Sequence, residues 1–302
     1  MLIEQELSFL NQLIIKTITD NNNKLSLDIS DYLASKSKRL RPALVFLFSK
    51  ALGIDIDDQI YHLACCVELI HNSTLVHDDI LDNAETRRGK ISLNCKIGNS
   101  LSVLAGDILL SVALKELAKF GSLEAVNIFS QSLYDMCKGE INQNFSIGKV
   151  PSLSEYIQKS EHKTAELYKA VLSSFASVYI KEHQKDIIEF AVNFGIAFQI
   201  KDDLINIMKT DHSKPVLSDI YNGIYTAPVI FLCEDTGDIN GFSEKEIIDK
   251  INSNKKYIDK TVELIKSYSE KAIDSIKFIM DNDYKKEIIN LTENLYKAGI
   301  YE

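Results

Sequence analysis

The sequence predicts an all-α protein. Apolar side chains recur at helical spacing over long stretches, as at Ile60, Leu63, Val67 and Ile70. No stretch sustains the alternation of apolar and polar residues that is typical of a half-buried strand. Gly (12 residues) and Pro (4 residues) are scarce, and neither forms a linker-like stretch. We therefore expect one helical domain over residues 1–302.

Helical spacing and the breaks between helices divide the chain into elements. The expected helices, in order, are 2–21, 40–52, 57–82, 99–120, 122–147, 153–181, 184–208 and 225–233, with several more between 243 and 298. Clusters of Asn, Gly and Pro predict interruptions at 21–24, at 87–98, around Pro151 and at 209–223. Two of these interruptions follow acidic motifs.

Composition and charge exclude several classes of function. The net charge is −9 and the pI is near 5.3, so the chain has no basic field for nucleic acid or anionic lipid. The five cysteines are odd in number and show no metal-ligand spacing, which favours buried thiols. The N-terminal stretch carries acids, and no run approaches eighteen apolar residues. We therefore expect no signal peptide, no membrane span and a cytoplasmic location.

The first acidic motif lies at the end of the expected helix 57–82. Asp78 and Asp82 stand four positions apart, so both carboxylates project from one face about one turn (~5.4 Å) apart, with Asp79 turned aside. Carboxylates this close repel unless a cation lies between them, and Mg²⁺ prefers such oxygens together with water and phosphate. A solvated acidic helix end is the alternative explanation.

A second acidic pair and two basic clusters accompany this motif. Asp202 and Asp203 follow an apolar stretch, and Asn206 lies four residues after Asp202. The basic residues form two groups: Lys38, Arg39 and Arg41 before Pro42, and Arg87, Arg88 and Lys90 after the first motif. Arginine meets phosphate oxygens with two N–H groups at once, so these clusters suit phosphate binding. Exposed charges at the start of a helix are the alternative for the first group.

In their order and spacing, these features resemble the trans-isoprenyl diphosphate synthases, the polyprenyl synthetase family. The resemblance runs through nearly the whole chain and rests on KRLRP (38–42), ELIHNSTLVHDDILD (68–82), RRGK (87–90), GNSLSVLAGD (98–107), KGEINQ (138–143), HKTAELY (162–168), FQIKDD (198–203) and KPVLSD (214–219). It implies a bundle of long helices around a central cavity, the isoprenoid synthase fold, with the two aspartate motifs facing each other at its mouth.

The resemblance also implies a reaction. An allylic diphosphate ionises, the double bond of isopentenyl diphosphate attacks the cation, and a proton is lost, which leaves an allylic diphosphate one isoprene unit longer. No protein nucleophile is required, and a homodimer is usual in the family. The catalytic subunits of some heteromeric long-chain synthases also lack a family lysine that Ile224 replaces here, so a partner subunit in place of a homodimer stays open.

The family's functional residues map onto positions of this chain. Three Mg²⁺ ions are expected on Asp78, Asp82 and Asp202. The allylic diphosphate is expected on Arg87, Lys163, Thr164, Gln199 and Lys214, with Lys163 also counted as catalytic. Isopentenyl diphosphate is expected on Lys38, Arg41, His71 and Arg88. His77 precedes Asp78, but Mg²⁺ prefers oxygen ligands, so we expect His77 to be structural.

Product length is expected to depend on the residues below Asp78. Thr74 lies one helical turn upstream, Ser73 beside it, and Ile70 two turns upstream. Short-chain relatives place aromatic side chains near Ser73 and Thr74, and both are small here. The sequence thus predicts a long-chain product, and a short-chain farnesyl or geranylgeranyl diphosphate synthase is the alternative.

The chain departs from the family at three places. Lys36 and Ser37 replace two glycines before Lys38, Asn206 replaces a third aspartate, and Ile224 replaces a lysine. These changes allow a second alternative, a weakly active or regulatory subunit of a heteromeric synthase. A terpene cyclase would not need the isopentenyl site, and a helical scaffold would not need paired acidic motifs.

Overall fold

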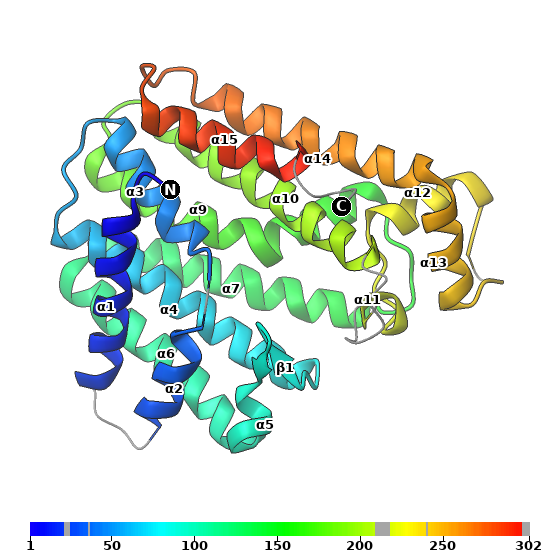
Figure 1. Cartoon of the computed structure of the whole chain (residues 1–302), viewed down its shortest axis with the longest axis horizontal. Coiled ribbons are helices and arrows are strands. Elements are labelled where there is room, and N and C mark those ends of the chain that lie inside the picture. The colour runs from blue at the N-terminus through cyan, green and yellow to red at the C-terminus, as the bar shows by residue number, and fades with distance from the viewer. Residues whose placement is uncertain (21–24, 36, 209–217, 240, 298–302) are drawn as a thin grey trace. The chain divides into compact units, whose positions relative to one another are not determined.

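The computed structural model describes residues 1–20, 25–35, 37–208, 218–239 and 241–297. These residues are predominantly helical, which confirms the expected all-α class (Figure 1). The chain divides into two compact units. The first unit comprises residues 1–129, 170–182 and 279–288, and the second comprises 130–169, 183–278 and the residues from 289 onward. The single domain expected from the sequence stays a prediction.

The elements follow one another along the chain in this order: α1 (Glu4–Asp20), α2 (Ser26–Leu33), α3 (Leu40–Ala51), α4 (Asp58–Leu81), β1 (Thr86–Arg87), β2 (Lys90–Ile91), α5 (Leu93–Ile97), α6 (Asn99–Phe120), α7 (Leu123–Phe145), α8 (Leu153–Ser160), the π-helical turn η1 (Glu161–Ala165), α9 (Glu166–Tyr179), α10 (Gln184–Met208), α11 (Ser218–Tyr221), α12 (Ala227–Thr236), α13 (Glu244–Ser253), α14 (Lys255–Ser275) and α15 (Asp283–Lys297). The boundary between the units falls within α7, α9 and α15.

In the first unit, α4 packs along α6 and against α3. Its buried face includes Ile60, Val67 and Ile70, each with no exposed surface. Burying a side chain of this size contributes roughly 1.5–3 kcal/mol. The close approach of α4 to α6 depends on Gly106 of α6, because a Cβ atom at this position would lie 2.2 Å from Nε2 of His77 on α4. His77 therefore fills the space that this glycine leaves.

In the second unit, α10 packs against α14 and η1. A Cβ atom on Gly195 of α10 would lie 2.5 Å from Cα of Ala165, so only glycine permits this contact. The sequence predicts one helix over 153–181, whereas the structure has α8, η1 and α9 in this stretch. A π-helical turn inserts one residue without changing the character of the side chains, so hydrophobic spacing does not reveal it.

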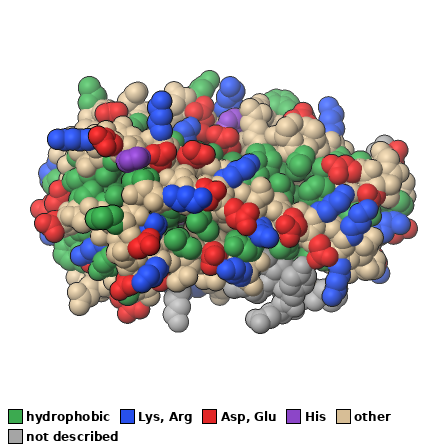
Figure 2. Space-filling model, turned by 90° about the horizontal axis from the view of Figure 1, so that it is seen from above, with side chains coloured by type: hydrophobic (Ala, Val, Ile, Leu, Met, Phe, Trp, Pro, Cys, Tyr) green, Lys and Arg blue, Asp and Glu red, His purple; other side chains and the backbone are tan. Residues whose placement is uncertain are grey.

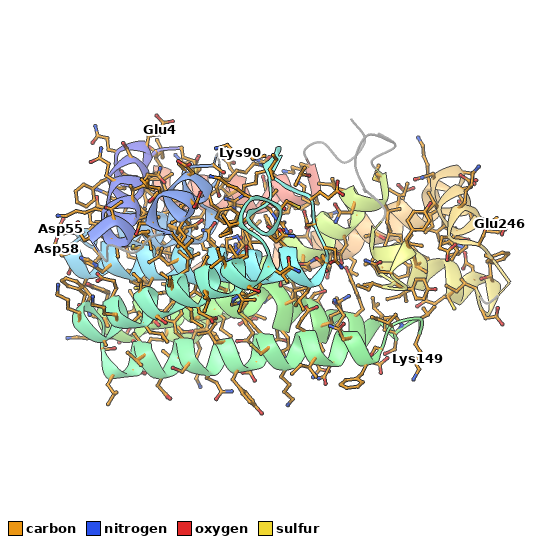
Figure 3. The ribbon with its side chains drawn as sticks, turned by 90° about the horizontal axis from the view of Figure 1, so that it is seen from below. Glu4, Asp55, Asp58, Lys90, Lys149 and Glu246 are labelled. Carbon is orange, nitrogen blue, oxygen red and sulfur yellow. The ribbon has the colours of Figure 1, made fainter. Side chains whose placement is uncertain are left out.

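The other expected helices agree with the structure to within a few residues, and three short helices, α2, α5 and α11, were not expected. They have eight, five and four residues, too short for a helical repeat to be recognised. Several longer helices begin at local signals. Ser243 and Glu246, for example, form a reciprocal capping box at the start of α13, where Figure 3 labels Glu246.

The surface mixes charges of both signs. On the face seen in Figure 2, Lys and Arg side chains alternate with Asp and Glu side chains and with hydrophobic patches, without a field of one sign. Within the described ranges, we find no helix with the length and apolar character needed to cross a membrane.

Candidate active site

The first aspartate motif lies at the C-terminal end of α4. Asp82 caps the helix, and its backbone N–H donates to the carbonyl oxygen of Asp78 at 2.8 Å, so the two residues lie one turn apart as predicted. Asp78 is half-buried and Asp82 is exposed. The last turn of α4 carries no basic residue. Acids at a helix C-terminus meet the negative end of its dipole, so this end favours an external cation.

Asp79 lies inside the protein and is held by Arg87. Its side chain has no exposed surface, and its Oδ1 accepts from Nε of Arg87 at 2.7 Å and also from Nη2. Its Oδ2 is buried with no hydrogen-bond partner among the described residues. Burial raises the pKa of Asp79, and Arg87 opposes that shift. Arg87, which was expected on the allylic diphosphate, is thus oriented by an acid of the metal motif.

A two-stranded hairpin presents the neighbouring arginine. Residues Thr86 and Arg87 pair with Ile91 and Lys90 in antiparallel register. Arg88 and Gly89 connect the strands with φ angles of 52° and 77°, the signs that a type I′ turn requires. Arg88 therefore stands at the tip of the hairpin, and Lys90 projects from the second strand (Figure 3).

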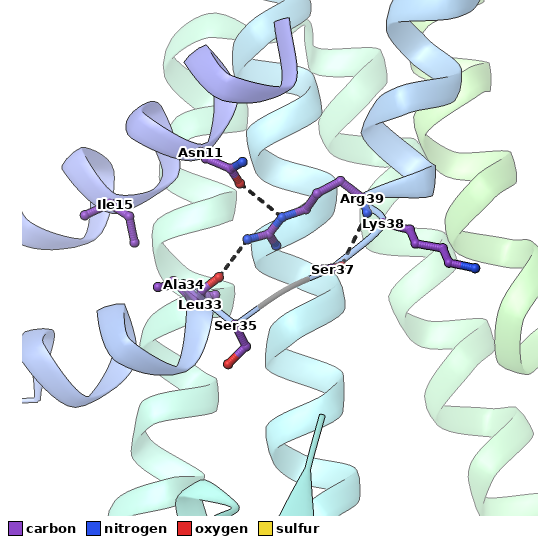
Figure 4. Close-up of a pocket in the computed structure, with 8 residues that line it drawn as sticks. All are labelled: Asn11, Ile15, Leu33, Ala34, Ser35, Ser37, Lys38 and Arg39. Carbon is purple, nitrogen blue, oxygen red and sulfur yellow. Dashed lines mark hydrogen bonds between the residues drawn. The ribbon is translucent and has the colours of Figure 1, made fainter. Parts of the chain in front are cut away.

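Arg39 connects three segments in the first unit (Figure 4). Its Nη1 donates to Glu68 Oε1, its Nη2 donates to the carbonyl oxygen of Leu33 at 2.7 Å, and its Nε donates to Asn11 Oδ1 at 3.2 Å. The amide of Asn72 donates to the same Glu68 oxygen at 3.0 Å. Arg39 and Glu68 are 6% and 2% exposed, so this is a buried ion pair. Arg39 therefore ties the loop before α3 to α1, α2 and α4.

The expected isopentenyl residues flank this pair. Lys38 is exposed, and Arg41 and His71 are half-buried. Burial lowers the pKa of His71 well below 6.5, and the charges of Arg41 and Arg88 lower it further. His71 is therefore neutral at pH 7, and the guanidinium groups that act on its ring form a cationic cluster. A cavity of about 640 Å³ opens beside Lys38 and Arg39, lined also by residues of α1 and α2 (Figure 4).

The second aspartate pair lies on α10. Asp202 is exposed, whereas Asp203 is only 6% exposed. Asp203 accepts from the Tyr156 hydroxyl at 2.7 Å and from Nε2 of Gln199, also at 2.7 Å. The Thr164 hydroxyl donates to Oε1 of Gln199. The structure thus brings together Thr164 and Gln199, which were both expected on the allylic diphosphate.

Two lysines were also expected on the allylic diphosphate, and two departures from the family pattern lie in the same part of the chain. Lys163 is 41% exposed on η1, with its Nζ 3.9 Å from Oε2 of Glu140 on α7. Lys214 lies outside the described residues. Asn206 and Ile224, two of the departures from the family pattern, are both half-buried.

The expected chain-length residues lie on the α4 turns before Asp78. Ile70 is fully buried, and Ser73 is 2% exposed with its hydroxyl donating to the carbonyl oxygen of Gly106 on α6 at 2.8 Å. Thr74 is half-buried and donates to the carbonyl oxygen of His71 at 2.8 Å. A larger side chain at Ser73 would press on α6, so Thr74 is the better position for testing product length.

Sequence reasoning missed three residues that organise these regions. Glu68 holds Arg39 and accepts from Asn72, and Tyr156 donates to Asp203, which accepts from Gln199. A lone acid inside the apolar stretch of α4 was a usable signal for Glu68, because buried acids are almost always paired. Nothing in the sequence marks Tyr156, since its partner is 47 residues away.

The side chains expected to hold the metal are carboxylates. Asp78, Asp82 and Asp202 offer carboxylate oxygens, the ligands that Mg²⁺ prefers, and none of them is a buried side chain. The two aspartate motifs belong to different units. Within the described ranges, no three His, Cys, Asp or Glu side chains converge on a metal-sized site. The donor types of each motif fit Mg²⁺.

The helices and their acidic and basic side chains define a class of all-α enzymes that act on diphosphates. The polyprenyl synthetase profile matches residues 23–265, and the chain belongs to this family. It is therefore a transferase of the prenyltransferase type.

Relatives and solved structures agree over nearly the full length. A prenyl transferase from Cyanidium caldarium is 32% identical, with 97% of this chain and 95% of that protein covered. Solanesyl-diphosphate synthase 1, mitochondrial, from Oryza sativa subsp. japonica is also 32% identical, with coverage of 97% and 77%. The crystal structure of heptaprenyl diphosphate synthase from Staphylococcus aureus superposes with a TM-score of 0.90 at 27% identity, with coverage of 97% and 98%. The isoprenoid synthase fold expected from the sequence is confirmed.

Proposed function

We propose that this protein extends an allylic diphosphate with isopentenyl diphosphate and releases a long-chain trans-polyprenyl diphosphate. The observation that carries this proposal is the first motif: Asp78 and Asp82 stand one turn apart at a helix end, and Asp79 of the same motif holds Arg87. One motif thus combines oxygen ligands for a cation with a guanidinium group for a diphosphate. The long-chain names of the relatives support the class of product.

The proposed metal ligands are Asp78, Asp82 and Asp202, which would hold three Mg²⁺ ions together with the diphosphate. Bound Mg²⁺ supplies positive charge that stabilises the diphosphate leaving group. Asp79 does not need to take part, because Arg87 already occupies one of its oxygens. Its contribution is to hold the Arg87 guanidinium beside the metal motif.

The proposed binding residues act through charge and hydrogen bonds. Isopentenyl diphosphate is assigned to Lys38, Arg41, His71 and Arg88, and the allylic diphosphate to Arg87, Lys163, Thr164, Gln199 and Lys214. The charges of Arg41 and Arg88, which both act on His71, support the first assignment, since guanidinium groups bind diphosphate oxygens strongly. The hydrogen bond between Thr164 and Gln199 supports the second assignment. In the reaction the C–O bond of the allylic diphosphate breaks, a C–C bond forms, and one proton leaves.

The decisive experiment supplies the purified protein with farnesyl diphosphate, excess isopentenyl diphosphate and Mg²⁺. We expect diphosphate release that stops on chelation of the metal, and dephosphorylated products longer than geranylgeraniol. Release without chain growth would favour a cyclase. No turnover until a second, different subunit is added would favour a partner in a heteromeric synthase.

Product length is tested at Thr74. We expect Thr74→Phe to shorten the products, because Thr74 lies one turn below Asp78 and is half-buried. Thr74→Val is the matched control, because it keeps the branched shape and loses only the hydroxyl. If Thr74→Phe and wild type give the same products, the growing chain does not pass this turn. A wild type that stops at farnesyl or geranylgeranyl diphosphate would make this a short-chain enzyme.

A homodimer is proposed as the working assembly. Leu101, Val103 and Leu104 on α6 are all more than 40% exposed, and a second copy of the chain would cover them. Sedimentation at micromolar concentration tests this, and Leu104→Lys should shift a dimer toward the monomer. The cytoplasmic location expected from the sequence stays a prediction.

A further inference from the structure

We infer that Tyr156 is a positioning residue of the allylic site, which acts through Asp203 to fix the amide of Gln199 and the hydroxyl of Thr164. This inference rests on the proposed roles of Gln199 and Thr164 in holding the allylic diphosphate. Tyr156 itself touches neither substrate in this account. The four side chains are called the relay.

The relay begins inside the protein. Tyr156 has no exposed surface, and its hydroxyl donates to Oδ2 of Asp203 at 2.7 Å. A buried hydroxyl without a partner would be costly, and a carboxylate is a strong acceptor for it. Burial raises the pKa of Tyr156 well above 10, and Asp203 raises it further. The hydroxyl therefore keeps its proton and remains a donor throughout the neutral range.

The hydrogen bond from Tyr156 to Asp203 is followed by two more, from Gln199 to Asp203 and from Thr164 to Gln199. Gln199 turns its NH₂ group toward Asp203, and its Nε2 donates to Oδ1 of that side chain at 2.7 Å. The carbonyl oxygen of Gln199 then faces Thr164, whose hydroxyl must donate to it. Without the carboxylate held in place, the Gln199 amide could turn over and the Thr164 hydroxyl would lose its fixed direction.

The backbone around Thr164 is already held by close contacts. Gly195 of α10 lies against Ala165, and a Cβ atom on Gly139 of α7 would lie 2.8 Å from Cβ of His162. Both neighbours belong to η1, so this turn is packed from two helices. Side-chain rotation is the freedom that remains, and the relay removes it. Preorganising polar groups in this way lowers the cost of binding and reaction.

The test removes one oxygen atom. Tyr156→Phe keeps the ring and deletes the relay's first donor. Tyr168→Phe is the matched control, because Tyr168 is equally buried and its ring contacts Phe194 and Phe198. We expect Tyr156→Phe to lower kcat/KM for the allylic diphosphate roughly ten- to a hundredfold, the worth of a hydrogen bond to a charged group. KM for isopentenyl diphosphate should stay unchanged, as should both constants in Tyr168→Phe.

A double-mutant cycle separates positioning from general loss of structure. In the Gln199→Ala background, Tyr156→Phe should have little further effect on kcat/KM, because Asp203 is then no longer connected to Thr164 through Gln199. Equal loss toward both substrates, or effects of the two changes that multiply, would overturn the inference. Thermal unfolding of each variant shows whether the fold survives.

A binding measurement keeps the inference independent of turnover. Calorimetric titration with farnesyl diphosphate and Mg²⁺ should show weaker binding by Tyr156→Phe than by Tyr168→Phe. If wild type binds this ligand but forms no product, the proposed function is contradicted, and weaker binding by Tyr156→Phe than by Tyr168→Phe still supports the relay. Equal binding by the two variants would overturn the relay, whether or not the protein makes product.

Discussion

Asp79 and Asp203 occupy matching positions in the two regions of the molecule that carry aspartate pairs. Each is the second acid of its pair, and they are 0% and 6% exposed, whereas Asp78 and Asp202 are more accessible. The buried acids are stabilised differently. Asp79 is paired with the charge of Arg87, and Asp203 accepts hydrogen bonds from two neutral side chains.

The difference indicates what each region has to hold. Pairing two charges inside a protein costs desolvation on both sides, and removing one partner leaves the other buried and unpaired. A hydroxyl and an amide cost less to bury and fix direction without adding charge. The first region therefore orients a cation, whereas the second orients neutral groups whose donor and acceptor atoms must face the correct way.

The largest effect is expected at the accessible acid of each pair. Asp78→Ala and Asp202→Ala should each lower kcat roughly 10²–10³-fold, the scale for losing one charge-stabilising group at a leaving oxygen. The matched control is Asp58→Asn, an exposed acid in the first turn of α4. Steady-state diphosphate release measures all three variants. Turnover of Asp202→Ala near that of wild type would show that only the first pair serves the metal.

The next effect concerns stability and separates the two kinds of pairing. Arg87→Met leaves Asp79 buried and unpaired, so we expect a loss of about 3 kcal/mol in the free energy of unfolding. Tyr156→Phe should lose about 1.5 kcal/mol, the low end for a hydrogen bond to a charged group, since Asp203 keeps Gln199 as a donor. Urea denaturation measures both. The double variant Asp79→Asn/Arg87→Met should recover most of the loss, and equal losses in the two single variants would contradict the comparison.

A smaller effect depends on pH and belongs to the first region. The pKa of His71 is lowered from 6.5 in the folded protein, so below that pH the unfolded chain binds more protons. The contribution of His71 to the free energy of unfolding is thus fully present above about pH 6.5. It is lost as the pH falls, by about 1 kcal/mol per pH unit as long as His71 stays neutral in the folded protein. Wild type should lose this much more stability than His71→Asn between pH 6.5 and 5.5. If the free energy of unfolding depends on pH in the same way for the two proteins, the pKa of His71 is not lowered by folding.

The smallest effect is expected at Asn206. Asn206→Asp restores the charge that the family has at this position, so it should keep activity and lower the Mg²⁺ concentration needed for half-maximal turnover. Asn206→Ala, which removes the oxygen, should not lower it. A magnesium titration of the three proteins decides this, and identical curves would show that the position does not contribute to metal binding.

Much of this organisation could be predicted from local patterns. The long helices followed from the spacing of apolar residues, because an amphipathic helix needs only its own sequence to show its buried face. The one-turn separation of Asp78 and Asp82 followed from helix geometry. The basic clusters next to the first motif were also visible, since their residues are close in sequence.

Side-chain partners over longer distances could not be predicted. Arg39 was placed with the phosphate-binding cations by its neighbours in sequence, but in the fold it is turned toward Glu68, 29 residues away. Likewise, Arg87 and Asp79 were both singled out, but their pairing depends on the path of the hairpin.

The sequence by itself determined the all-α class, the helical positions of the acids and the family, because each depends on local periodicity or on short motifs. Only the tertiary structure decided which aspartates are buried, which cations are already paired, and that a π-helical turn carries Lys163 and Thr164. The physical reason is that burial and hydrogen-bond direction belong to contacts between segments. In the sequence, Tyr156 is one residue of the expected helix 153–181, and it becomes a donor to Asp203 only when α8 and α10 pack together.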